Sequence, residues 1–337
     1  MSAITFAAVW LCTTAGAQVT CPRPTTVDGV RTIVFDDGSF AMRLPMNVNA
    51  DGAPGAYTQG DHGFTYITNG VDLWRDGRRI DCRDRRNNCR QRFLEAERRG
   101  FAPGTDEFCA FGIAVDAMLD TGPVPCRKGV VFGNGKGKPR LGGVLRSVAG
   151  EDVSYYVSTT SLTHPVGGQQ SYLDAKLVPA VVIPMSRAES LGQVVWTRHG
   201  SQDAFAVAGD TGPNFGEASI ALHQLLRYGM LVEQSPGPIP RSARCGPEEF
   251  GIKAPYMSRP DVSGDDCAGG REAQSDSDIR AYAGLASVDF VFLGGARFER
   301  EGNALTEEVT AASLTAHAED AGYTKSRLQQ MAACLEE

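Results

Sequence analysis

Two carboxylates separated by a short loop are the strongest sign of chemistry in this sequence. Asp210 and Glu217 stand at the ends of a glycine-marked loop within GDTGPNFGEASIAL, residues 209–222. Two positioned carboxyl groups are the minimum machinery for glycosidic bond hydrolysis, because one donates a proton and the other activates water. The same residues also have a purely structural interpretation, since Asp and Gly form turns and an acid in the first turn of a helix offsets its dipole.

The segments on either side of this loop predict elements that would hold the two acids. Residues 204–209 (AFAVAG) indicate a short buried strand, and residues 218–228 carry apolar side chains at helical spacing. We therefore expect Asp210 at the end of a strand and Glu217 at the beginning of a helix. Loops held by rigid elements are frequent locations for catalytic groups.

Strand patterns dominate the rest of the chain. Asp37-Gly38 and Asn69-Gly70 predict hairpins within residues 32–44 and 63–74. Thr306, followed by two glutamates, indicates a helix start, and we expect a helical segment from there to Cys334. Further strands are predicted at residues 154–161, 177–184, 194–197 and 288–293. The pattern favours a β-rich α+β fold, with a barrel-like mixed β core, a few peripheral helices and disulfide staples.

Two segments of unusual composition have both a functional and a structural interpretation. Residues 75–99 are rich in arginine, which suits an anion- or membrane-facing patch but is more typical of a charged surface helix or loop. Residues 129–143 contain VVFGNGKGKPRLGG, which lacks the spacing of a P-loop or a dinucleotide-binding loop. We expect a flexible turn there.

Composition and the first residues bear on location and partners. The chain has 337 residues with a net charge of −7, which argues against nucleic acid and suits a cationic substrate. An apolar run at residues 4–11 and AGA at 15–17 predict a secretory signal over residues 1–17, the alternative being a buried N-terminal strand or helix. The run is too short to cross a bilayer. We expect a secreted or periplasmic monomer that has no membrane contact after signal cleavage.

The cysteines fit export. Cleavage near Ala17 would remove Cys12 and leave eight cysteines, an even number that suits disulfides in an oxidising compartment. Sequence alone does not choose among the possible connectivities, although Cys82–Cys89, Cys109–Cys126 and Cys245–Cys267 are plausible local pairs. The lack of a CxxC motif and the scattered histidines argue against a zinc site, so we expect no metal.

The predicted organisation is a single catalytic domain with extensions. A tail over residues 18–30 follows the signal, and the domain covers residues 31–300. A Pro-, Gly- and Asp-rich loop insertion lies within it at residues 233–280, and a helical segment follows at residues 301–337.

Several segments together resemble glycoside hydrolase family 75, the chitosanases, in its bacterial branch. The main match is the Gly-Asp-Thr turn followed by Gly-Glu-Ala-Ser-Ile in residues 209–222. Supporting segments are ADGAPGAY at 50–57, YYVSTTSL at 155–162, YLDAKLVPAVVIP at 172–184 and VDFVFLGG at 288–295. The resemblance implies an inverting endo-hydrolase of β-1,4-linked glucosamine polymer that needs no cofactor.

The resemblance also implies roles for particular residues. Glu217 would be the general acid and Asp210 the general base. Because a helix N-terminus stabilises a carboxylate, the roles are exchanged unless burial raises the pKa of Glu217. Asp51 and Asp174 would bind the glucosamine ammonium, or act as turn residues. Tyr155, like Tyr156 and Trp196, would stack on sugar rings, or pack in the core.

Other functional interpretations stay open. The same chemistry can act on a different aminoglycan or on peptidoglycan, and the chain can be a non-catalytic carbohydrate-binding module. His164, His199 and His223 suggest a serine hydrolase, but no nucleophile-elbow motif accompanies them.

Overall fold

The computed structural model describes residues 19–54, 56, 71–80, 82, 85–117, 124–126, 129–146, 152–231 and 284–336. The predicted hairpin at Asn69-Gly70, the signal segment with Cys12, the 233–280 insertion and the Cys245–Cys267 pair lie outside these residues.

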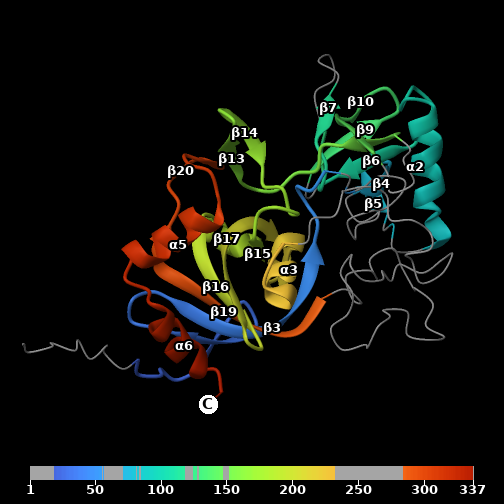
Figure 1. Cartoon of the computed structure of the whole chain (residues 1–337). Helices are drawn as coiled ribbons and strands as arrows, with labels where there is room; N and C mark the ends of the chain where they lie inside the picture. Colours follow the sequence, from blue (N-terminus) through green and yellow to red (C-terminus); the bar gives the residue numbers. More distant parts are fainter. Residues whose placement is uncertain are drawn as a thin grey trace, which may run out of the picture.

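A closed barrel of six strands forms the centre of the molecule (Figure 1). Its strands, in order around the barrel, are β3 (Phe40–Asn49), β18 (Glu217–Ser219), β15 (Ala180–Pro184), β17 (Gln202–Gly212), β16 (Gln193–His199) and β19 (Gly284–Arg297). β19 pairs with β3 and closes the ring. The barrel is mixed, because β3–β18 and β15–β17 are parallel pairs and the other neighbours are antiparallel. The predicted β-rich α+β fold with a barrel-like core is confirmed.

The barrel strands form where β-branched and aromatic residues concentrate. β15 is AVVIP and buried throughout, and β16 begins QVVWT. The hairpin predicted at Asp37-Gly38 is confirmed: β2 (Val30–Val34) pairs with β3, with Val34 opposite Phe40. β1 (Thr25–Val27), in the predicted tail, adds to the outer edge of β2.

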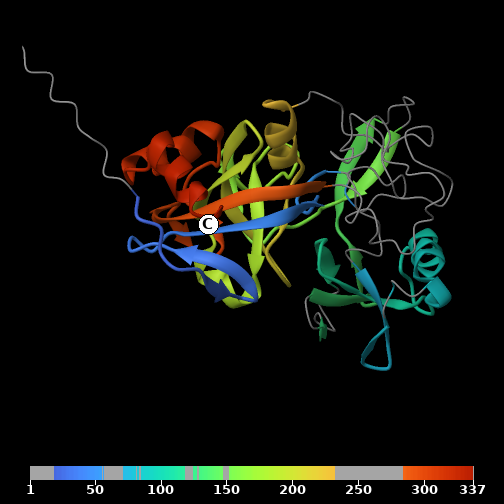
Figure 2. The ribbon, with the colours of Figure 1, turned by 90° about the horizontal axis from the view of Figure 1, so that it is seen from below.

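A second lobe is inserted between β3 and β12 (Asp152–Tyr156) (Figures 1 and 2). Its five-stranded sheet has the order β5 (Arg78–Ile80), β4 (Val71–Arg75), β6 (Glu107–Ala110), β9 (Gly129–Gly133) and β8 (Val124–Cys126). Helix α2 (Cys89–Arg98), preceded by the short 3-10 turn η1 (Arg85–Asn87), covers it, which confirms a helix within the arginine-rich segment. The lobe has its own aromatic core, in which Phe93 packs edge-on against Phe101 and Phe108.

The prediction of a flexible turn at residues 129–143 is wrong. β9, β10 (Gly137–Pro139) and the start of β11 (Leu141–Arg146) occupy this segment. The turn is confined to Asn134 and Gly135, which both have positive φ. β10 pairs with β7 (Val115–Ala117), and β11 pairs with β12. These strand pairs fix backbone that the glycine content had suggested was flexible.

The remaining elements flank the barrel. β14 (Gln169–Tyr172), β13 (Thr163–Val166), β21 (Ala304–Leu305) and β20 (Arg300–Glu301) form a small sheet, and η2 (Met185–Ser190) follows β15. Helices α5 (Ala311–Asp320) and α6 (Lys325–Ala333) cover the side of the barrel away from the inserted lobe (Figures 1 and 2). α3 (Ile220–Tyr228) lies between the barrel and the lobe.

The helix expected from Thr306 begins later. Thr306 donates its backbone N–H to Glu299 O, which holds it beside the β20–β21 pair. α5 starts after Thr310, where Thr310 and Ser313 form a reciprocal capping box. The predicted helical character of the C-terminal segment is confirmed by α5 and α6.

Three disulfides lie among the described residues. Cys82–Cys89 and Cys109–Cys126 agree with the local pairs suggested by spacing. Cys21–Cys334 spans 313 residues, and spacing gave no sign of it. It ties the segment before β1 to the end of α6.

Candidate functional site

Asp210 and Glu217 lie on one face of the barrel wall, on the two neighbours of β15. Val182 of β15 is paired with Asp210 of the parallel strand β17. Val181 is paired with Ala218 of the antiparallel strand β18, so the next step along this ladder sets Glu217 beside Val182. Residues directly opposite on neighbouring strands share a face. The two acids therefore flank Val182 on the same side of the sheet.

Their separation follows from strand spacing. Neighbouring strands lie about 4.8 Å apart, so the backbones of Asp210 and Glu217 are about 10 Å apart across β15. Inverting glycosidases hold their two carboxyl groups about 6.5–9.5 Å apart, which leaves room for a water, and a backbone separation of about 10 Å is compatible with that range. The two side chains are close enough for the charge of Glu217 to raise the pKa of Asp210.

The structure corrects the expected local positions of both acids. Asp210 lies within β17, which continues to Gly212, rather than at its end. Glu217 opens the short strand β18, and α3 begins three residues later at Ile220. The N-cap of α3 is Ser219, whose Oγ accepts the Leu222 N–H at 3.2 Å. Glu217 is therefore fixed by barrel pairing, with Asn47 of β3 as its parallel partner.

Ser161 and Thr211 hold one oxygen of Asp210. Asp210 Oδ1 accepts hydrogen bonds from Ser161 N at 2.8 Å, Ser161 Oγ at 2.7 Å and Thr211 N at 2.8 Å. The hydroxyls of Ser161 and Thr211 are themselves 2.9 Å apart. Three donors on a single oxygen fix the orientation of the carboxyl group and direct Oδ2 away from this network.

Burial dominates the protonation of Asp210. Removal from water raises the pKa of Asp210 to about 6, and the Glu217 charge acts in the same direction. The hydrogen bonds from Ser161 and Thr211 lower the pKa but do not offset burial. An acid that is half-protonated near pH 6 can serve as a proton donor under mildly acidic conditions.

Four separate segments converge at this position. The turn at Gly52 packs against Leu173, because a Cβ at Gly52 would overlap Leu173 O. Leu173 N in turn donates to Thr160 Oγ1 at 3.1 Å. Leu162 N donates to Gly209 O at 3.0 Å, next to Asp210. The motifs at 50–57, 155–162, 172–184 and 209–222 are therefore brought into contact.

Asp51 and Asp174 lie on these converging segments, and each lies in a local turn. Asp51 N donates to Asn49 Oδ1 at 2.7 Å. Asp174 Oδ1 accepts the Lys176 N–H at 2.9 Å, and burial raises the pKa of Asp174. Lys176 is beside it, and burial lowers the pKa of its ammonium to about 8. The Asp174 side chain therefore has the turn role that the sequence also allowed, and in the other turn Asn49 is the residue whose side chain accepts the backbone bond.

The aromatic candidates are not assembled around the acid pair. The Tyr155 ring lies over two glycines of β11, since a Cβ at Gly142 would be 2.5 Å from Tyr155 Cε2. Tyr156 is buried against Phe93 in the lobe core and donates to Glu97. Trp196 is 1% exposed inside the barrel cluster. Among the described residues, the side-chain hydrogen bonds of Asp210 come from Ser161 and Thr211, and none comes from Tyr155.

The histidines have structural partners. Both ring nitrogens of the buried His223 lie 2.9 Å from backbone carbonyl oxygens, those of Ser219 and Met46. His164 Nδ1 accepts the Val309 N–H at 3.1 Å. His199 Nδ1 lies 2.7 Å from Ser287 O. None of these contacts forms a relay to a serine nucleophile.

Sequence reasoning missed Ser161, the residue that holds Asp210. It lies in YYVSTTSL, which indicates a strand and supports the resemblance but does not point to Ser161 itself, and its partner is 49 positions away along the chain. The part of the chain that the structure describes holds no group of three or more His, Cys, Asp or Glu side chains arranged to bind a metal ion.

Comparison with known proteins does not identify a family. No protein-family model matches the chain, and no curated protein matches it. Among the described residues, no helix has the length and apolar character needed to cross a bilayer.

Proposed function

We propose that this protein is an exported inverting glycoside hydrolase that cleaves internal bonds of a β-1,4-linked glucosamine polymer. The observation that carries the proposal is the placement of Asp210 and Glu217 on either side of Val182, on one face of the barrel. Two carboxyl groups so spaced suit attack by a water held between them and the sugar. The resemblance of residues 209–222 to the chitosanases supplies the substrate class.

The environment of Asp210 favours it as the proton donor, which reverses the roles that the resemblance implies. Burial raises its pKa to about 6, and three donors fix Oδ1, so the proton resides on Oδ2. Asp210 would protonate the leaving glycosidic oxygen. Glu217 would then take a proton from the attacking water on the opposite face of the ring.

Export and a cationic substrate have independent support. Disulfides are typical of oxidising compartments outside the cytosol, and three are present among the described residues. A net charge of −7 attracts a polymer that bears ammonium groups.

The test is release of reducing ends from chitosan by wild type, Asp210→Asn and Glu217→Gln. We expect each variant to lose activity by a factor of about 100 or more while keeping its fold, because proton transfer by a positioned group contributes at least that much. Glu189→Gln is the matched control, since Glu189 is an exposed carboxylate on η2. NMR of the first products should show the inverted anomer.

Other outcomes distinguish the alternatives. Turnover of chitin or peptidoglycan with chitosan inert would keep the acid pair and change the polymer. Saccharide binding without turnover, unaffected by either substitution, would indicate a carbohydrate-binding module. Full activity in Asp210→Asn or Glu217→Gln would remove that residue from the mechanism.

A further inference from the structure

A cavity lies on the far side of the barrel from the inserted lobe. It has a volume of about 380 Å³ and is enclosed between the barrel strands β16 and β17 and the helices α5 and α6. Small-molecule sites typically have volumes of about 300–1,000 Å³. Phe205 in this cavity and Asp210 are five positions apart on β17, which is about 16 Å along a strand, so this cavity is separate from the acid pair.

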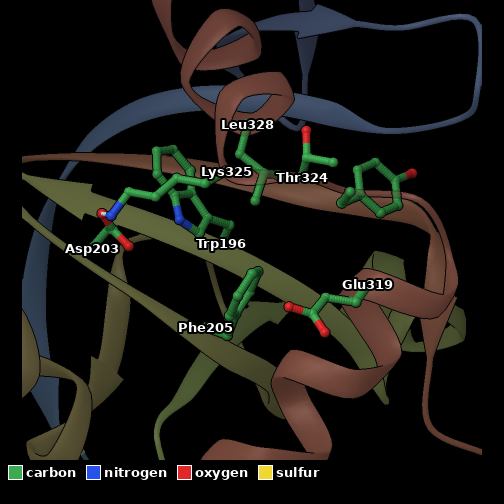
Figure 3. Close-up of a pocket in the computed structure, with 8 residues that line it drawn as sticks. Trp196, Asp203, Phe205, Glu319, Thr324, Lys325 and Leu328 are labelled. Carbon is green, nitrogen blue, oxygen red and sulfur yellow. Dashed lines mark ion pairs between the residues drawn. The ribbon is translucent and has the colours of Figure 1, made fainter. Parts of the chain in front are cut away.

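The cavity has an apolar base and a charged rim. Trp196 and Leu328 are buried beneath it, and the half-buried Phe205 ring stands in the open space between them and α5 (Figure 3). Lys325 reaches across Trp196 to Asp203, with Nζ 2.8 Å from Oδ2. This ion pair closes one side and satisfies both of its charges.

Glu319 gives the open side a net negative charge. Its carboxylate projects from α5 toward the Phe205 ring (Figure 3). Within the described part of the chain, no hydrogen bond or ion pair engages this carboxylate. An aromatic ring next to an uncompensated carboxylate is suited to a ligand that carries an ammonium group beside an apolar face.

The other aromatic rings at this site already have cationic partners. The Arg198 guanidinium lies 6.0 Å from the Trp196 ring centroid, and that of Arg327 lies 4.6 Å from the Tyr323 centroid. Phe205 is therefore the ring available to a ligand. The apolar face of a pyranose would cover it, and an amino group on that pyranose would meet Glu319.

We propose that this cavity is an accessory site that binds an amino-sugar unit, with Phe205 under the sugar ring and Glu319 paired with the ammonium. The choice of an amino sugar over other ring-bearing amines rests on the proposed function. The site would hold the polymer to the protein away from the place of cleavage.

The test is calorimetric titration of the Asp210→Asn protein with a glucosamine tetramer, which that variant is expected to leave uncleaved. Introducing Glu319→Gln should weaken one binding event about tenfold, as the loss of one charge-assisted hydrogen bond predicts. Phe205→Leu should weaken the same event. Asp320→Asn is the matched control, because it removes the same charge from the next, exposed residue of α5 that does not line the cavity. The N-acetylated tetramer, which lacks the ammonium, should not occupy this site.

Unchanged affinity and stoichiometry in both Glu319→Gln and Phe205→Leu would overturn the proposal, and so would equal binding of the acetylated tetramer at this site. The two proposals can fail separately. If wild type releases no reducing ends from chitosan but tetramer binding depends on Glu319, the accessory site stands without the hydrolase. If hydrolysis proceeds and binding is indifferent to Glu319, the accessory site alone is wrong.

Discussion

The protonation of Asp210 reflects a competition between burial and hydrogen bonding. Burial and the Glu217 charge raise its pKa, and the donors from Ser161 and Thr211 lower it. With a pKa of about 6, Asp210 keeps its proton below that pH and loses it above. We expect kcat/KM on chitosan oligomers to fall as pH rises through about 6, since the proton donor is then ionised. A rate that instead rises through pH 6 and stays high at pH 8 would assign Asp210 as the base.

Removal of a donor should move this limb of the profile. Ser161→Ala deletes a hydroxyl that stabilises the ionised form of Asp210, so the pKa of Asp210 should rise and the decline in kcat/KM should begin at higher pH. Thr211→Val is the control, because its hydroxyl contacts Ser161 Oγ, whereas its backbone N–H, which the substitution retains, bonds Asp210. A displaced limb in Thr211→Val but not in Ser161→Ala would contradict the assigned network.

The same raised pKa has a consequence for stability. The folded pKa of Asp210, about 6, exceeds the model-peptide value of 3.8, so the native state binds more protons between these values and its free energy of unfolding falls as pH rises from 4 to 6. Asp210→Asn keeps an oxygen for the three donors and removes the buried charge. The difference in unfolding free energy between variant and wild type should grow by about 3 kcal/mol from pH 4 to pH 7 in urea titrations. A difference in unfolding free energy that does not change with pH would mean that folding does not shift the pKa of Asp210.

At the scale of elements, the barrel ladder and the turns that pack against it set the geometry. Gly52 has φ of +91°, and a side chain there would overlap the backbone oxygen of Leu173. Gly52→Ala should lower the free energy of unfolding by about 3 kcal/mol or more, because left-handed strain adds to a clash with backbone. Gly77→Ala is the comparison: Gly77 has φ of +70° with open space around it, so about 1 kcal/mol is expected. Equal losses in urea unfolding would show that the Gly52 turn does not pack tightly on Leu173.

The sequence predicted single elements well where local pattern decides them. The Asp37-Gly38 hairpin and the strands around Val194 and Val288 follow from turn residues and β-branched runs, which act over a few positions. Helix α5 begins at Thr310 instead of Thr306 because Thr306 is bonded to Glu299, a tertiary contact that no local pattern contains.

The candidate site was predictable in part for the same reason. Asp210 and Glu217 are close in sequence, so a motif can identify both. Their common neighbour Val182 and the donor Ser161 belong to other segments, which the pairing of β15 with β17 and β18 and the bond of Ser161 to Asp210 bring together. The strand β18 at Glu217 is only three residues long, too short to show an alternating pattern.

At the scale of the whole molecule, Glu217 lies on β18, next to the contact between the barrel and the inserted lobe, and the disulfide Cys21–Cys334 lies at the end of α6. The lobe core includes Val48 of β3 and Ile220 of α3, so the barrel and the lobe share buried surface beside β18. Changes on the α6 side should therefore alter stability with little effect on chemistry at Asp210.

The disulfide between Cys21 and Cys334 provides that test. It closes a loop of 313 residues, and long loops gain most from a cross-link in the chain-entropy account. Two further contacts join the same region: Val19 N donates to Gln330 Oε1 at 3.0 Å, and Arg43 Nη2 lies 2.6 Å from Glu336 Oε1. Both are at the surface or partly exposed, so they should not replace the covalent link.

The double variant Cys21→Ser/Cys334→Ser should lose about 3–5 kcal/mol of unfolding free energy and keep its activity at low temperature. Reductant breaks all three disulfides of the wild type, whereas the double variant lacks only Cys21–Cys334. Comparing the reduced wild type with the oxidised variant therefore separates the effect of this bond from those of Cys82–Cys89 and Cys109–Cys126. Unfolding of the double variant at the same denaturant concentration as oxidised wild type would show that the packing of α6 on the barrel holds this region without the disulfide.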